Sequence, residues 1–190
     1  MDVNTSLYKK KIFIFGYFGW HNAGDDAIGV ATIRELSKRK PLAEFFITVN
    51  DDYFLHKNKF NNNVHGVKFD ILSILRAIKK SDIFIITGGT HFQDQDEFIF
   101  RRLKIFLFFQ FLIVYAYTLK KPPILLGHGI GPIRKWWSKY FLRSILKHSR
   151  VITVRDKDSY DLVKMLGFEN KCLLGFDIAS LLIEAIHKTE

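Results

Sequence analysis

The chain has 190 residues, of which 48% are hydrophobic and 25% charged, and its formal net charge is +10. It is long enough for one domain with a sizeable core and too apolar to be disordered. The single cysteine, Cys172, excludes a disulfide scaffold and a cysteine-only zinc site, so we expect the reducing environment of the cytoplasm. Three lysines, Lys9–Lys11, precede an apolar run, but Ile12–Phe15 is too short for the core of a secretory signal.

Short apolar runs alternate along the chain with amphipathic stretches. In chain order they predict a strand at Lys11–Gly16, a helix at Asp26–Arg39, strands at Phe45–Val49 and Val64–Phe69, a helix at Ile71–Lys79, a strand at Asp82–Thr87, a helix at Glu97–Leu119, a strand at Pro123–Gly127, a helix at Lys135–His148, a strand at Val151–Val154, a helix at Asp158–Leu166 and a strand at Cys172–Gly175. Continuously apolar strands between helices are typical of a parallel sheet covered on both faces. We therefore expect a single Rossmann-like α/β domain over residues 1–190, with a doubly wound, mostly parallel sheet.

Glycine and small polar residues follow four of the predicted strands. In sheets of this class, ligands bind beyond the carboxyl ends of the strands, and glycine lets the backbone approach a ligand closely. Four such loops therefore predict a binding cleft at one edge of the sheet. They are Gly16–Asp26, Gly88–Asp94, Gly127–Pro132 and Arg155–Ser159.

These loops together resemble the polysaccharide pyruvyl transferase family. The family pattern is a Gly-x-x-Gly-x-x-Asn-x-Gly-Asp-(Asp/Glu)-Ala loop, then Gly-Gly-Gly-x-x-x-Asp, Gly-x-Gly-Ile-Gly-Pro and Arg-Asp-x-x-Ser, in the order found here. Three places depart from it: Thr90 replaces a glycine, His128 replaces a common glutamine, and Phe176–Ala179 lacks a proline after its aspartate.

The resemblance implies a fold and a reaction. Family members have two Rossmann-type halves, as in GT-B glycosyltransferases, and this chain resembles the N-terminal half, with the second domain absent. The implied reaction transfers a pyruvyl group from phosphoenolpyruvate to two sugar hydroxyls, as a ketal, in cell-surface polysaccharide synthesis. The acceptor would be a glycan or a lipid-linked sugar, and no cofactor is implied. The family's catalytic histidine lies in the second half, which a second polypeptide could supply.

Candidate substrate-binding residues come from the four loops. Arg155 is the leading one, because its planar guanidinium suits a carboxylate or phosphate; the alternative is an ion pair with Asp156, Asp158 or Asp177. Asp94 is expected either to cap the long helix or to touch the acceptor. The remaining candidates are Asn22, Gly24, Asp25, Gly88, Gly89, Gly127, Gly129 and Gly131.

Helix capping is the competing explanation for several of these residues. Asp25 and Asp26 suit the positive end of a helix, and an acidic pair would repel phosphate, so contact with sugar hydroxyls is the alternative role. Asp156 and Ser159 have the spacing of a capping pair.

No catalytic residue can be assigned from the pattern alone. His128 is a candidate general acid, although a lone loop histidine is more often a polar lining residue. His21 and His91 are weaker alternatives of the same kind. The spacing of these histidines does not match that of metal ligands, so the sequence does not predict a metal site.

The positive charge is concentrated between Phe98 and Arg155, where there is no acidic residue. Within this segment four basic residues recur along one predicted helix, beside Trp136 and Trp137: Lys135, Lys139, Arg143 and Lys147. Such a stripe is either an ordinary solvated face or a contact with an anionic membrane surface, which would place the protein on the inner face of the cell membrane. We expect the apolar helix nearby, over Ile105–Leu119, to pack on the sheet because it is too short to span a bilayer.

Other function classes stay open at this level. The chain could be a non-catalytic or degenerate binding module, or a GT-B-like glycosyltransferase domain that uses a nucleotide sugar. We expect no nucleic-acid partner, because the aromatic residues of the basic segment do not resemble a base-stacking platform.

Overall fold

The computed structural model describes residues 9–95 and 99–182. Within them a seven-stranded, all-parallel sheet has the order β3-β2-β1-β4-β5-β6-β7. The strands are β1 (Lys11–Phe18), β2 (Glu44–Val49), β3 (Val64–Lys68), β4 (Ile83–Thr87), β5 (Ile124–His128), β6 (Val151–Val154) and β7 (Cys172–Leu174). The helices are α1 (Ala23–Arg39), α2 (Tyr53–Asn58), α3 (Ile71–Lys80), α4 (Ile99–Thr118), α5 (Trp136–Lys147) and α6 (Lys157–Met165), with 3-10 turns η1 (Glu169–Lys171) and η2 (Ile178–Ser180). The predicted fold class is confirmed.

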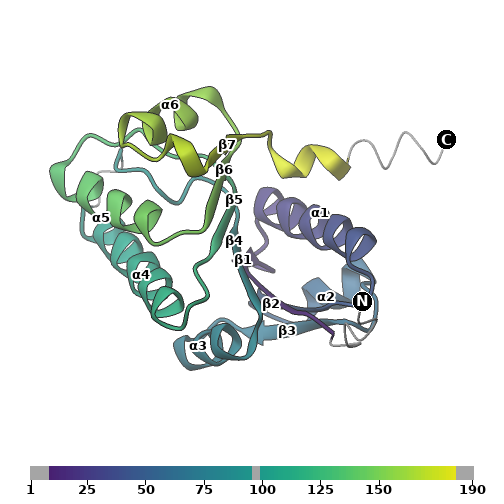
Figure 1. Cartoon of the computed structure of the whole chain (residues 1–190). Helices are drawn as coiled ribbons and strands as arrows, with labels where there is room; N and C mark the ends of the chain where they lie inside the picture. Colours follow the sequence, from purple (N-terminus) through teal and green to yellow (C-terminus); the bar gives the residue numbers. More distant parts are fainter. Residues whose placement is uncertain (1–8, 96–98, 183–190) are drawn as a thin grey trace, which may run out of the picture.

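Helices cover the sheet on both faces, as Figure 1 shows. One core lies between the sheet and α3, α4, α5 and α6, and it includes Ile74, Phe109, Leu142 and Val163. The other lies between the sheet and α1 and α2, and it includes Ile33. The central strands β1 and β4 contain unbroken apolar runs, Ile12–Phe15 and Ile83–Ile86, because both of their faces are buried.

The sheet reverses its direction of winding between β1 and β4. The chain adds β2 and β3 on one side of β1 and then returns to add β4, β5, β6 and β7 on the other. The loops that leave β1 and β4 therefore separate toward opposite faces and open a crevice between them, which is where ligands bind in doubly wound sheets. This position brings Asn22 and Gly88 to the same crevice.

Most of the element boundaries agree with the predictions, and the differences have local causes. β1 runs two residues beyond the predicted end because Tyr17 and Phe18 pack on the cores. α1 begins three residues earlier because the side chain of Asn22 caps it by accepting from the Gly24 N–H. The six-residue helix α2 was not predicted, because so short a helix shows no clear apolar period. The predicted start of the long helix, Glu97, lies outside the described residues.

The long helix α4 is buried on one face only. Phe106, Phe109, Ile113 and Ala116 pack on the sheet, as expected for an apolar helix of this length. Its outer face, by contrast, leaves large apolar side chains in solvent, and Phe100 is 81% exposed. No helix in the described part of the chain combines the length and the apolarity that crossing a bilayer requires.

Candidate functional site

The loops after β1, β4 and β6 meet at the carboxyl edge of the sheet and line an open cavity of about 390 Å³. The segment after β7 closes one side of it. The cavity is lined by Asn22, Gly24, Asp25, Ile28, Gly89, Thr90, His91, Gln93, Arg102, Arg155, Asp177 and Ala179. Five of the predicted substrate-binding residues are therefore brought together around one cavity: Asn22, Gly24, Asp25, Gly89 and Arg155.

Arg155 is held in place from two sides. Its Nη1 donates to Asp177 Oδ2 at 2.9 Å, and its Nη2 donates to Thr90 Oγ1 at 3.3 Å. Asp156 lies further from it, at 3.7 Å from Nε. The predicted ion pairs with Asp156 and Asp177 are thus present, yet the side chain is still 30% exposed and lines the cavity. A fork fixed in this way can present its remaining N–H groups to an anion with little loss of side-chain entropy.

Gly129 explains why the guanidinium can lie flat on the loop after β5. A Cβ atom at this position would lie 3.0 Å from Arg155 Nε and 3.1 Å from Nη2. A side chain at Gly129 would therefore require the guanidinium of Arg155 to shift by a few tenths of an ångström.

The start of α1 forms another wall of the cavity. The Asn22 side chain caps the helix and donates from Nδ2 to Asp25 Oδ2 at 2.9 Å. Asp26 instead accepts from the Gly19 N–H at 2.8 Å, so it stabilises its own loop. Burial raises the pKa of the Asp25 carboxyl, a hydrogen bond from the Gly89 backbone partly offsets this, and Asp26 adds to the rise. Asp25 is thus a carboxylate of increased basicity that faces the cavity.

The loop after β4 supplies backbone and one buried histidine. Gly88 has φ of +124°, a conformation that glycine adopts without strain. A Cβ there would lie 3.0 Å from His91 Nε2. This nitrogen is buried and has no hydrogen-bond partner among the described residues, although His91 lines the cavity. Burial, with His128 and Arg102 nearby, lowers the pKa of His91 to about 3, so its ring is neutral at pH 7.

His128 lies beneath the cavity and does not line it. The side chain is completely buried, and Nε2 donates to the Ile86 carbonyl at 3.1 Å. Burial lowers its pKa to about 4, against the opposing effect of its backbone hydrogen bonds. The ring is neutral at pH 7, out of reach of a ligand in the cavity, and packs against Phe92.

The sequence predicts that Asp94 caps the long helix or touches the acceptor; among the described residues, its carboxylate instead caps the start of α5. Its carboxylate accepts from the N–H groups of Arg134 and Lys135 and from the Ser138 hydroxyl. Burial opposes its ionisation, but these hydrogen bonds outweigh that effect and hold the pKa of Asp94 below its usual value. The side chain is only 3% exposed, so it positions the start of α5 from the loop after β4.

A second cavity of about 590 Å³ lies on the other side of Arg155. Gly129 and Gly131 line it, whereas Gly127 is buried against Ile178. The predicted cap at α6 is confirmed, since Asp156 Oδ1 accepts from the Ser159 N–H at 2.8 Å.

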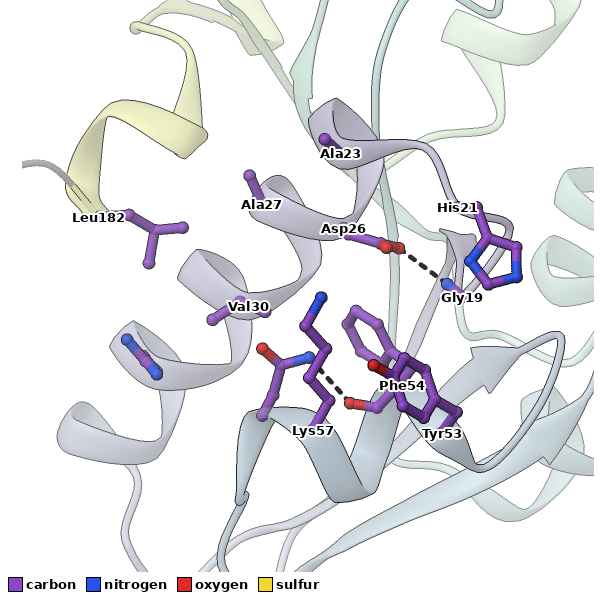
Figure 2. A pocket seen from close by; sticks show the side chains of 12 residues that line it. Gly19, His21, Ala23, Asp26, Ala27, Val30, Tyr53, Phe54, Lys57 and Leu182 are labelled. Carbon is purple, nitrogen blue, oxygen red and sulfur yellow. Dashed lines mark hydrogen bonds between the residues drawn. The ribbon is translucent and has the colours of Figure 1, made fainter.

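There are two larger hollows, of which one adjoins the cleft and the other is separate from it. One of about 1140 Å³ shares Asn22, Asp25 and His91 with the cavity and adds the rings of Tyr17, Trp20 and Phe100. Figure 2 shows the other, of about 890 Å³, between α1 and α2 and next to Leu182. It lacks every predicted substrate-binding residue, and its Asp26 is already bonded to Gly19. His21, exposed and away from the cleft, lines this separate hollow.

Sequence reasoning did not assign Asp177, Thr90 or the aromatic wall to the site. Asp177 follows β7 just as Arg155 follows β6, so the rule about carboxyl ends of parallel strands could have found it. Thr90, a departure from the family pattern, supplies the hydroxyl oxygen that accepts a hydrogen bond from Arg155 Nη2. Tyr17 and Trp20 lie in the predicted cleft loop Gly16–Asp26, but their aromatic side chains did not suggest a role in binding, since such residues are usually core. Among the described residues, no three His, Cys, Asp or Glu side chains gather where they could hold a metal ion.

The fold and the site define a Rossmann-like α/β domain with a polar cleft at its topological switch point. A family model, described as polysaccharide pyruvyl transferase, matches residues 22–190. The chain therefore belongs to the polysaccharide pyruvyl transferase family. A search of curated proteins finds no match.

The buried histidine predicts a pH-dependent stability. The folded-state pKa of His128 is lowered, so the unfolded chain binds its proton first as the pH falls below about 6.5. The free energy of unfolding should therefore decrease between pH 6.5 and pH 5, by about 2 kcal/mol from His128 and by a similar amount from His91, whose pKa is also lowered. Urea unfolding at both pH values measures it. His128→Gln should reduce the decrease, whereas His56→Gln on the exposed side of α2 should leave it unchanged; an equal decrease in both variants would contradict the assignment.

The Asp94 cap predicts a second effect on stability. Asp94→Ala removes a helix cap and leaves buried donors without an acceptor, so we expect a loss of about 2–4 kcal/mol in the free energy of unfolding. The matched control is Asp70→Ala, because Asp70 caps α3 from an exposed position through one backbone N–H. That change should cost about 1 kcal/mol. Equal losses in denaturant unfolding would show that Asp94 is no more than an ordinary cap.

Proposed function

We propose that the protein is a ketal pyruvyl transferase that acts on phosphoenolpyruvate and a sugar diol in cell-surface polysaccharide synthesis. A proton adds to the methylene carbon of phosphoenolpyruvate, which becomes the methyl group of the ketal. One sugar oxygen bonds to the neighbouring carbon, and the second displaces phosphate from it. The two hydroxyl protons balance the step, one entering the methyl group and one leaving with phosphate.

The observation that carries this proposal is the position of Arg155. Phosphoenolpyruvate has a carboxylate and a phosphate, which planar guanidinium forks and helix N-termini bind well. The cavity offers the fork of Arg155 on one side and the N-terminus of the 17-residue helix α1 on the other. Because Asn22 already caps α1 and Asp25 would repel a phosphate, we place the anionic groups of the donor at Arg155. Arg102 also lines this cavity, and the Gly89 backbone lies at its wall. We assign the donor to this cavity.

The acceptor sugar fits the adjoining hollow. Tyr17, Trp20 and Phe100 supply flat apolar rings there, which suit the apolar face of a pyranose, and Asp25 lies where the two spaces meet. A carboxylate would repel the donor phosphate but can accept the proton of a hydroxyl. We assign Asp25 as the general base for the acceptor, a role that its raised pKa assists.

The general acid is not among the histidines of the cleft. His128 is buried below it, and the lowered pKa of His91 makes that ring a neutral group at pH 7. The orphaned Nε2 of His91 is instead suited to hydrogen-bonding a bound ligand or water. We propose that the acid comes from a second Rossmann-type half, in the same or another polypeptide, that closes over the cleft.

Binding of the donor tests the role of Arg155. Arg155→Lys keeps the charge but loses the fork, so we expect phosphoenolpyruvate to bind about 10- to 100-fold more weakly in calorimetry. The matched control is Arg150→Lys, because Arg150 is exposed at the opposite end of β6. Binding of a nucleoside diphosphate sugar in place of phosphoenolpyruvate would favour a glycosyltransferase. Absence of both would favour a binding module of another kind.

Kinetics test the role of Asp25. Asp25→Asn should lower kcat for phosphate release by about 100-fold, the usual contribution of a general base, with little change in the KM for phosphoenolpyruvate. The wild-type rate should fall on the acid side at a higher pH than an ordinary aspartate would give, because protonation removes the base and the pKa of Asp25 is raised. An unchanged kcat, or a loss confined to KM, would remove Asp25 from this role. The assay is run on the 190-residue chain and on the chain together with a second Rossmann-type half, joined to it or added as a separate polypeptide.

A further inference from the structure

The outward surface of α4 and α5 exposes several large apolar side chains, where a solvated pair of helices usually carries polar residues. Phe100 is 81% exposed, Trp136 80% and Tyr140 67%, and Leu107 and Phe111 are each close to half exposed. A soluble surface rarely gathers such residues without a partner. We call these five residues the apolar ridge.

The ridge lies on the outer sides of two neighbouring helices. Phe100, Leu107 and Phe111 are spaced by seven and four residues, so they share one side of α4, opposite the buried Phe109. α4 and α5 pack against each other along their length, with Phe106 against Trp137 and Gln110 Nε2 bonded to Ser144 Oγ at 2.7 Å. Figure 1 shows the two helices next to each other on one face of the sheet.

Basic side chains flank the ridge and face solvent. Lys104 lies on the same side of α4, and Lys139, Arg143 and Lys147 lie along α5. None of the four pairs with a carboxylate among the described residues. There is also no acidic residue between Ile99 and Arg155 in the sequence, so no carboxylate within the two helices offsets this charge.

We propose that this surface docks on an anionic membrane, with α4 and α5 lying in the plane of the interface. Amphipathic helices bind there when apolar rings enter the headgroup boundary and Lys and Arg contact lipid phosphates. Charge complementarity favours this occupant, because a second copy of the chain would present the same positive surface. Lys135 belongs to the sequence stripe but turns inward, over the Trp137 ring at 5.9 Å.

The docked surface borders the cleft. Phe100 belongs both to the ridge and to the aromatic hollow that contains Asp25. Docking would therefore hold that hollow close to the headgroup layer, where a lipid-linked sugar would be presented. This consequence rests on the proposed function, whereas membrane binding itself does not, and vesicle binding can be measured without any turnover.

Sedimentation with vesicles tests the proposal. The 190-residue chain should bind vesicles of phosphatidylcholine with about one quarter phosphatidylglycerol, bind phosphatidylcholine alone much more weakly, and dissociate as salt rises from about 0.1 to about 0.5 M. Lys139→Gln with Arg143→Gln should weaken partitioning about 30-fold, given about 1 kcal/mol for each basic residue. Trp136→Ser with Tyr140→Ser should weaken it at least tenfold, because two interfacial rings are removed.

Matched controls come from the opposite face of the molecule. Lys57→Gln with Lys59→Gln, and Tyr53→Ser with Leu42→Ser, alter exposed residues away from α4 and α5 and should bind as wild type. Circular dichroism confirms that each variant is folded. The proposal is overturned if anionic vesicles do not bind, or if the controls lose as much as the ridge variants. It is also overturned if the ridge variants abolish binding to duplex DNA or self-association while vesicle binding is unchanged.

Discussion

The site depends on one constraint, the parallel pairing of all seven strands. Because every strand ends at the same edge of the sheet, the loops after β1, β4, β5 and β6 all lie at that edge. The reversal of strand order between β1 and β4 then parts two of these loops and leaves the crevice open. The chemistry of the cleft follows from residues that the fold places there, and none of them needs an unusual backbone apart from the glycines.

The loops of this edge are tied to one another by side chains. Asp94 connects the loop after β4 to the start of α5, and the Ser159 hydroxyl accepts from the Ile130 N–H and so connects α6 to the loop after β5. Arg155 contacts three other segments: it donates to Asp177 after β7 and to Thr90 after β4, and its guanidinium lies against the Gly129 backbone after β5. These hydrogen bonds and contacts hold the loops in place before a ligand binds, which reduces the entropy cost of binding.

The helices on one face of the sheet serve two purposes. Their inner sides complete the larger core, in which Phe109 packs on Phe15 and Phe92. Their outer sides carry the ridge and its basic flanks, which the core does not require. A helix that only had to cover the sheet would expose polar residues there, since apolar side chains in water contribute nothing to folding. The combination of apolar and basic exposure is what points to a membrane partner, next to a cleft assigned to an anionic donor.

The sequence by itself determined the α/β class, nearly all the strands and helices, and the gathering of the glycine loops at one edge. These follow from local periodicity and from the rule that parallel strands end together. Only the tertiary structure decided that Asp94 caps α5, that His128 is buried and neutral, and that Thr90 and Asp177 hold Arg155. Those facts depend on contacts between residues from about 20 to more than 60 positions apart. Burial and pairing over such separations are set by how the layers pack and leave no periodic trace in the chain.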